Sequence, residues 1–288
     1  MTEETGSGRN NERRRNLTEE IREEMGEEMI SDKNIKAVIF DLDGTLLYTL
    51  EDLKNSLNYT LRQYKMPERT LEETRRFVGN GLMKLLERAT PADTPESVRQ
   101  EMYQVFKTHY DAHCLDATKP YEGVPELLER LKDEGYLLAI VSNKVDSAVK
   151  ELARQFFPQV DAAIGERPGV RPKPAPDTVQ EALAELEAVR KKREKRSESE
   201  PDRKKQERSA GTDAESSVAL CPEDCIYVGD SEVDLATAKA AGMPCISVLW
   251  GFREKEELLK NGADRFAEKP EDVSLMICRS RGSGNGRG

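Results

Sequence analysis

The chain has 288 residues, a formal net charge of -10 and a sequence pI near 5.1, and this acidic balance argues against a general nucleic-acid binder. Hydrophobic residues make up 36% of the chain and charged residues 35%, so part of it is expected to be solvated tail or linker. No apolar run approaches the roughly 18 residues of a membrane span, and the first residues contain no apolar signal region. We therefore expect a cytoplasmic protein that does not contact membranes.

The first ordered feature is a short apolar run that ends abruptly in two acids. Residues 1–33 are mostly Glu, Arg, Asn and Gly, which predicts a disordered or weakly helical extension. Residues 37–40 are all apolar, and Asp41, Asp43 and Gly44 follow them directly. This pattern is typical of a buried parallel strand that ends in a sharp turn. Ligands of open α/β sheets bind beyond the carboxyl ends of the strands, where this turn would place both aspartates.

Residues 49–119 show helical periodicity only. Leucines recur at helical spacing between residues 50 and 61 and again between 82 and 86, and apolar residues do so between 98 and 106. We interpret this stretch as a small all-helical cap domain inserted into a core domain of residues 34–48 and 120–275.

The remainder alternates apolar runs with helical patterns. The runs cover residues 136–141, 160–164, 225–228 and 245–249. This alternation predicts an α/β fold with a Rossmann-like parallel sheet and helices on both faces. Residues 190–217 contain almost no apolar residues and are expected to be a charged, mostly disordered insertion that is helical only at its start. A disordered tail is expected over residues 279–288.

Polar groups suited to a metal or a phosphate follow several predicted strands. They are Asp41 and Asp43 after the first, Ser142 and Asn143 after the second, Asp230 and Asp234 after a later one, and Lys173 in a proline-rich loop. Carboxylate oxygens suit Mg²⁺, which keeps several waters and takes few protein ligands. A hydroxyl, backbone N–H groups and a lysine suit the charge of a phosphate. The pattern therefore predicts phosphoryl transfer.

Four motifs occur in the order found in one known group of enzymes. DLDGT at 41–45, Ser142 after a buried strand, Lys173 in RPKPAPD and GDSEVD at 229–234 resemble the four motifs of the haloacid dehalogenase superfamily of phosphatases. The helical insertion after the first motif is similar to the cap of its phosphoglycolate phosphatase-like group.

Two further segments share this resemblance. FVGNG at 77–81 is similar to the cap loop of that group, and WGFR at 250–253 resembles the segment after its last motif. The resemblance implies that Gly79, Asn80 and Gly81 face the substrate.

The resemblance also implies a role for each motif residue. Asp41 would be the nucleophile, and Asp43 the general acid and base. The Asp41 carboxylate, the Asp43 backbone carbonyl and Asp230 would hold Mg²⁺, and Asp234 would steady the waters of the metal. The residues that would bind the transferring phosphoryl group are Ser142, the Asn143 backbone N–H and Lys173.

The expected function is Mg²⁺-dependent hydrolysis of a small phosphorylated metabolite, with 2-phosphoglycolate as the substrate that the resemblance implies. A pyrophosphatase or sugar phosphomutase on the same scaffold is an alternative, and a non-catalytic binding protein is another. The expected assembly is a monomer or homodimer. One departure is Tyr48 at the predicted cap hinge, just before Thr49, where many relatives have an acidic or amide residue followed by Ser or Thr. Tyr48 predicts a change in cap closure or substrate fit, with the catalytic core intact.

Overall fold

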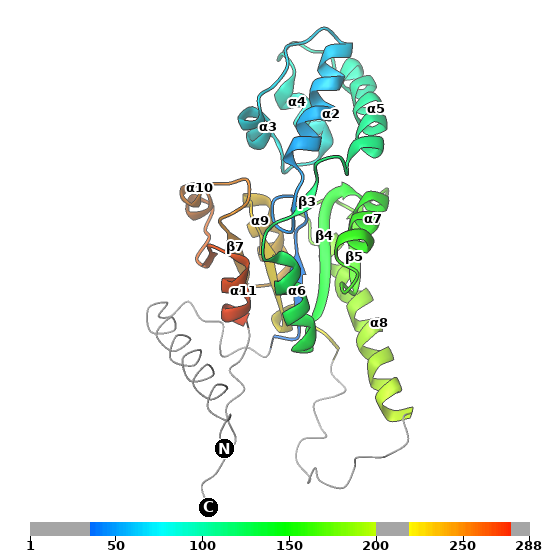
Figure 1. Cartoon of the computed structure of the whole chain (residues 1–288), viewed down its shortest axis with the longest axis vertical. Helices are drawn as coiled ribbons and strands as arrows, with labels where there is room; N and C mark the ends of the chain where they lie inside the picture. The colour runs from blue at the N-terminus through cyan, green and yellow to red at the C-terminus, as the bar shows by residue number, and fades with distance from the viewer. Residues whose placement is uncertain (1–34, 200–218, 278–288) are drawn as a thin grey trace, which may run out of the picture.

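A parallel sheet of six strands runs through the larger part of the molecule (Figure 1). The structure is a computed structural model that describes residues 35–199 and 219–277. The strand order is β5-β4-β1-β6-β7-β8, and every neighbouring pair is parallel. These strands are β1 (Ala37–Phe40), β4 (Leu137–Val145), β5 (Ala162–Glu166), β6 (Cys225–Gly229), β7 (Cys245–Val248) and β8 (Phe266–Ala267). The predicted α/β fold with a parallel sheet is confirmed.

Helices cover both faces of this sheet. The two faces can be told apart in β1, where Val38 and Phe40 belong to one apolar cluster and Ala37 and Ile39 to the other. The first cluster includes side chains from α6 (Val124–Asp133), α7 (Asp146–Phe156) and α11 (Pro270–Ile277). The second includes side chains from α8 (Asp177–Ser199) and α9 (Glu232–Ala241). Because both faces of β1 are buried, its run of apolar residues is continuous rather than alternating.

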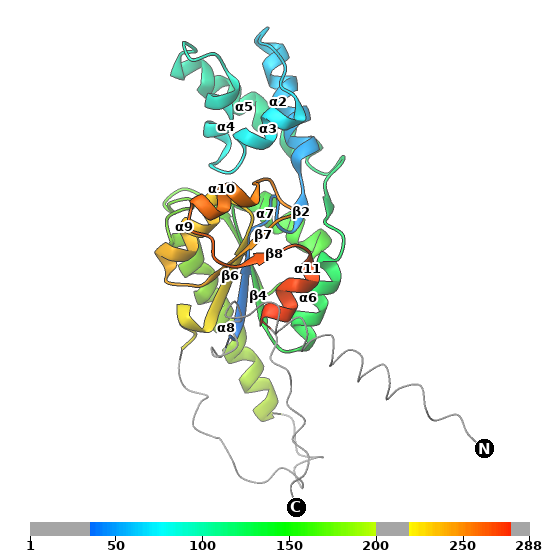
Figure 2. The ribbon, with the colours of Figure 1, turned by 90° about the vertical axis from the view of Figure 1, so that its left-hand side faces the viewer.

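A separate group of helices lies beyond the carboxyl end of β1 (Figures 1 and 2). It consists of α2 (Leu50–Gln63), α3 (Leu71–Phe77), α4 (Leu82–Ala89) and α5 (Glu96–His113). These helices have their own apolar core, which includes Leu57, Leu86 and Phe106. The sequence pattern indicated α2, α4 and α5 but missed α3, although the capping box of Thr70 and Glu73 marks its start. We call this helical group the cap.

Two short antiparallel strands join the cap to the rest of the chain. β2 (Leu47–Tyr48) pairs with β3 (Lys119–Pro120), and the Tyr48 ring packs edge-on against Tyr121 at 5.9 Å between centroids. Beside them, the buried Asp52 carboxylate accepts hydrogen bonds from the backbone N–H groups of Ala117 and Thr118, at distances from 2.8 to 3.1 Å. The chain entering the cap is thereby fastened to the chain leaving it.

Two elements are longer than their apolar sequence patterns: the strand β4 and the helix α8. β4 continues to Val145 instead of ending at Val141, with a shift of register against β5 in between, so Ser142 and Asn143 lie within the strand. The predicted insertion is helical from 190 to 199, where Arg193 forms an ion pair of 2.7 Å with Asp161. The rest of that insertion, the N-terminal extension and the C-terminal tail lie outside the described residues.

The shorter elements complete the description: they are η2 (Pro222–Asp224) before β6 and α10 (Lys255–Lys260) after β7. No helix in the described part of the chain combines the length and the apolar character needed to cross a membrane.

Replacing Asp52 with Ala should lower the free energy of unfolding by about 1–3 kcal/mol, because the N–H groups of Ala117 and the buried Thr118 lose their acceptor. Urea unfolding followed by circular dichroism measures this change. Glu51→Ala is the matched control, since Glu51 pairs with Lys54 in a partly exposed i,i+3 contact and its loss should cost less than about 0.5 kcal/mol. Equal effects of the two substitutions would contradict the role given to Asp52.

Candidate functional site

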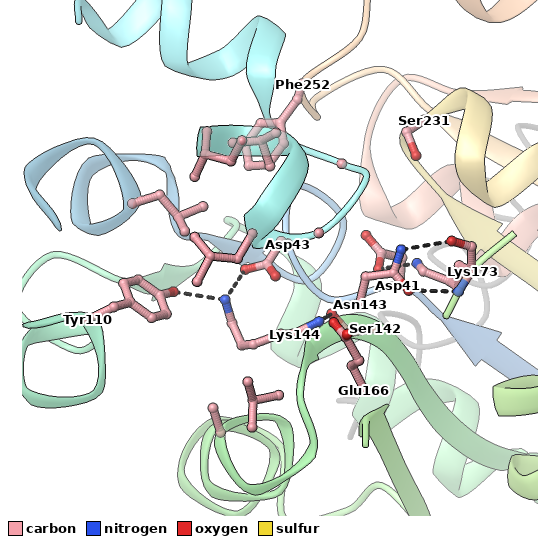
Figure 3. Close-up of a pocket in the computed structure, with 18 of the residues that line it drawn as sticks. Asp41, Asp43, Tyr110, Ser142, Asn143, Lys144, Glu166, Lys173, Ser231 and Phe252 are labelled. Carbon is pink, nitrogen blue, oxygen red and sulfur yellow. Dashed lines mark hydrogen bonds and ion pairs between the residues drawn. The ribbon is translucent and has the colours of Figure 1, made fainter. Parts of the chain in front are cut away.

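The carboxyl ends of β1, β4 and β6 meet below the cap and form the floor of a chamber (Figure 3). β1 is the central strand of the three, paired in parallel with β4 on one side and β6 on the other. Residues that follow each strand are therefore neighbours in space, although Asp41 and Asp230 are far apart in sequence. The chamber is lined by core residues such as Asp41 and Ser142 and by cap residues such as Leu85 and Phe106.

Three buried carboxylates form a cluster at this floor. One oxygen each from Asp41, Asp230 and Asp234 lies within 4.8 Å of the others. Burial raises the pKa of Asp41 well above its usual range; Lys173 opposes this, and the other two carboxylates add to it. Burial and the neighbouring Asp234 carboxylate also raise the pKa of Asp230, to about 7. A cation at this cluster would offset both the repulsion and the loss of water.

Lys173 supplies part of that compensation. Its ammonium lies 2.6 Å from Asp41 Oδ1 and 2.8 Å from Asp234 Oδ1, and its side chain is only 4% exposed. It also donates to the hydroxyl of Tyr227 at 3.2 Å. Burial lowers the pKa of Lys173, but the Asp234 and Asp41 carboxylates outweigh it and hold the ammonium well above its usual pKa range. Lys173 is therefore a fixed positive charge beside Asp41.

Asn143 holds the Lys173 backbone in place from the neighbouring strand. Its Oδ1 accepts from the Lys173 N–H at 2.7 Å, and its Nδ2 donates to the Lys173 carbonyl at 3.0 Å. Ser142 is buried, lines the chamber and accepts from the N–H of Lys144 at 3.2 Å. The predicted residues of the second motif and Lys173 thus meet at one place, with Asn143 as the link between them.

The loop after β7 positions Asp230. The Phe252 N–H donates to Asp230 Oδ2 at 2.6 Å. A Cβ added to Gly251 would lie 2.2 Å from the Asp230 Cβ, and one added to Gly44 would lie 2.4 Å from Asp230 Oδ2. Only glycine permits this approach at both positions, and Gly44 also has a φ of +94°. The glycine of the first motif is required by the acid of the fourth.

The chemistry of the cluster fits a hard divalent cation. Among the described residues, it offers only carboxylate oxygens, which are the ligands of such cations, and no thiolate or imidazole. Asp234 Oδ2 also accepts from the Ser231 hydroxyl at 2.6 Å and from the Ser231 N–H at 3.1 Å. The second contact belongs to the capping box of α9, and both fix the carboxylate. The Asp43 carboxylate lies outside the cluster, so a contribution from Asp43 would have to come from its backbone carbonyl.

The Asp43 carboxylate instead faces a lysine and a tyrosine (Figure 3). Lys144 Nζ lies 2.9 Å from Asp43 Oδ1 and 2.8 Å from the Tyr110 hydroxyl, which comes from α5 of the cap. Burial lowers the pKa of Lys144, but Asp43 and Tyr110 raise it by more, so the pKa lies above the usual range of a lysine. Sequence reasoning missed both residues. Tyr110 follows the helical period of its buried neighbour Phe106, and Lys144 directly follows the second motif without belonging to it.

The cap loop closes one side of the chamber. Gly79 and Gly81 line it, whereas the Asn80 side chain accepts from Arg88 Nη2 at 2.6 Å. Arg253 of the core reaches this loop and donates to the carbonyls of Arg75 and Val78 at 3.2 and 2.7 Å. This contact fixes the loop relative to the edge of the sheet that carries the carboxylate cluster.

Comparisons with known proteins identify the family of the chain. A family profile described as haloacid dehalogenase-like hydrolase matches residues 38–193, and a second for HAD-hydrolase-like proteins matches residues 170–274. A phosphoglycolate phosphatase of Aquifex aeolicus is 28% identical over 245 residues, which are 84% of this chain and 97% of the relative. Another, of Cereibacter sphaeroides, is 31% identical over 82% of this chain and 96% of its own.

A solved structure matches the whole arrangement. It is a protein of Lactobacillus delbrueckii subsp. bulgaricus whose assignment as a phosphoglycolate phosphatase is provisional. The two structures superpose with a TM-score of 0.71 at 31% identity, over 85% of this chain and 98% of the other. Profile, sequence and structure agree, and the chain belongs to the haloacid dehalogenase-like hydrolases.

Proposed function

We propose that this protein is a Mg²⁺-dependent phosphatase that hydrolyses a small phosphomonoester through an aspartyl-phosphate. The observation that carries the proposal is the buried Asp41 carboxylate, which lies 2.6 Å from the Lys173 ammonium and within the cluster that suits a divalent cation. The positive charges of Lys173 and of a cation at the cluster would offset the repulsion between the Asp41 carboxylate and an anionic phosphate, so Asp41 is placed to attack phosphorus.

The reaction has two steps. In the first, a carboxylate oxygen of Asp41 bonds to phosphorus as the bond to the alcohol oxygen breaks, and Asp43 gives that oxygen a proton. In the second, Asp43 takes a proton from water as the water oxygen attacks phosphorus. This attack releases inorganic phosphate and restores Asp41.

The other residues of the site bind the phosphoryl group and the metal. Ser142, the Asn143 N–H and Lys173 would stabilise the phosphoryl oxygens, on which charge is spread in the transition state. Mg²⁺ would be held by Asp41, Asp230 and the Asp43 carbonyl, with Asp234 beside them. When bound, it offsets the repulsion between the carboxylate and the phosphate.

The names of the relatives make 2-phosphoglycolate, which would yield glycolate and phosphate, the first substrate to test. Gly79 and Gly81 would face its leaving group, and in this proposal Asn80 shapes the loop. Pyrophosphate and a sugar phosphate represent the alternatives on the same scaffold.

Asp41→Asn should lower turnover by at least about a thousandfold, because an amide cannot form the aspartyl-phosphate. The fold should be retained, as checked by circular dichroism and thermal unfolding, since the two side chains have the same shape. Asp133→Asn, at an exposed position near the end of α6, is the control and should keep full activity. Appreciable turnover by Asp41→Asn would remove Asp41 as the nucleophile.

Phosphate release should depend on Mg²⁺ and fall on the order of 100-fold or more in EDTA. The assay uses 2-phosphoglycolate, pyrophosphate, a sugar phosphate and a nucleoside monophosphate in parallel. A preference for pyrophosphate would move the protein to that alternative class. If the folded protein released phosphate from none of them with Mg²⁺ present, the phosphatase proposal would be wrong.

A further inference from the structure

Lys144 offers the chamber a hydrogen-bond donor that no described residue of the protein accepts. Its side chain is 6% exposed, and its ammonium carries three protons. One contact is with Asp43 Oδ1 at 2.9 Å and another with the Tyr110 hydroxyl at 2.8 Å. Among the described residues, the Lys144 ammonium makes no other hydrogen bond or ion pair. Because the Tyr110 oxygen accepts from Lys144, its own proton is also available to a ligand.

The other cations that line the chamber are already engaged. Lys173 serves the Asp41 cluster, and the Lys107 ammonium is paired with Asp111 one turn along α5. Arg253 gives its N–H groups to the Glu232 carboxylate and to carbonyls of the cap. Lys107 also keeps unused protons, but its side chain is 36% exposed, so these protons are open to water, whereas the Lys144 side chain is 6% exposed. Lys144 is thus the buried lysine, among the described residues of the chamber, that keeps an unused proton beside Asp43.

Apolar side chains make up much of the lining of the chamber that Lys144 also lines. They include Leu53, Leu85, Phe106, Val145 and Ala148, while the acidic residues Asp111 and Glu166 line it too. A charge-assisted hydrogen bond is stronger in such surroundings than in water, whereas a buried charge without a partner is costly. A ligand anion would therefore gain more binding free energy at Lys144 than at the other cations that line the chamber.

We propose that Lys144 and Tyr110 form a subsite for a carboxylate on the leaving group and so select phosphoesters of short 2-hydroxy acids. The inference rests on the proposed function, because it assigns the alcohol side of the same site. The leaving group must be short, since Asp43 has to reach the ester oxygen and Lys144 lies only 2.9 Å from the Asp43 carboxylate. An anion bound by Lys144 therefore sits one or two carbons from that oxygen.

The same contact explains why the anion must come from the substrate. In the structure, Asp43 is the counter-ion of Lys144. When Asp43 turns to the ester oxygen, the ammonium needs another partner in an apolar chamber. A substrate carboxylate takes that place and leaves Asp43 free to turn, whereas a neutral leaving group does not.

A matched pair of substrates tests the subsite: 2-phosphoglycolate and 2-hydroxyethyl phosphate, which has a CH₂OH group where the first has its carboxylate. With the Mg²⁺-loaded full chain, kcat/KM should be about 10- to 100-fold higher for 2-phosphoglycolate. Lys144→Met should reduce this ratio to near one. Tyr110→Phe, which removes a single hydroxyl, should reduce it about three- to tenfold.

Lys107→Met is the matched control and should leave the ratio unchanged, because this lysine is paired at the rim of the same chamber. Circular dichroism checks the fold of each variant, and Tyr110→Phe decides the matter if Lys144→Met does not fold. Equal losses on both substrates, at an unchanged ratio, would mean that Lys144 acts only through Asp43 and would overturn the subsite. So would a wild-type ratio near one.

Failure of the subsite and failure of the phosphatase can be told apart. Hydrolysis of a sugar phosphate, with neither member of the pair hydrolysed, would overturn the subsite and leave the phosphatase proposal standing. No phosphate release from any substrate would overturn both.

Discussion

The ion pair between Lys173 and Asp41 is the interaction on which the site depends. Without a nearby positive charge, three carboxylates could not stay ionised together in a buried cluster, because burial and mutual repulsion both favour protonation. Lys173 bridges two of them at 2.6 and 2.8 Å. One ammonium leaves the cluster with more negative than positive charge, which is the condition under which a divalent cation binds well.

The fold makes this concentration of charge possible by bringing separate segments to one edge. β1 leads to Asp41, β6 leads to Asp230, and α9 carries Asp234 in its first turn. The parallel register of β1 with its neighbours fixes where these segments end. Glycines then let the backbone close around Asp230 where any Cβ would collide. The stability of the whole sheet, rather than of one loop, therefore offsets the free-energy cost of burying these carboxylates.

Much of this could be predicted from the sequence, because the signals are local. A continuous apolar run that ends in Asp41 marks a buried strand and its turn, and the prolines around Lys173 indicate an extended loop. The Thr70 capping box also indicates the short helix α3. We missed this helix because its seven residues make too few turns to show a helical period. The extension of β4 past Val141 could not be read, because it follows from an irregular pairing with β5.

The contacts of the cap were beyond local reasoning. Tyr110 has the spacing of a core residue in α5, and only the docking of the cap brings its hydroxyl to Lys144. The same holds for Arg253, which joins the cap loop to a segment whose Phe252 N–H holds Asp230 at 2.6 Å. One short segment therefore contacts both the Asp41, Asp230 and Asp234 cluster and the cap. A change in cap position would be transmitted to Asp230 through this backbone, so a cation at the cluster and the placement of the cap would be coupled.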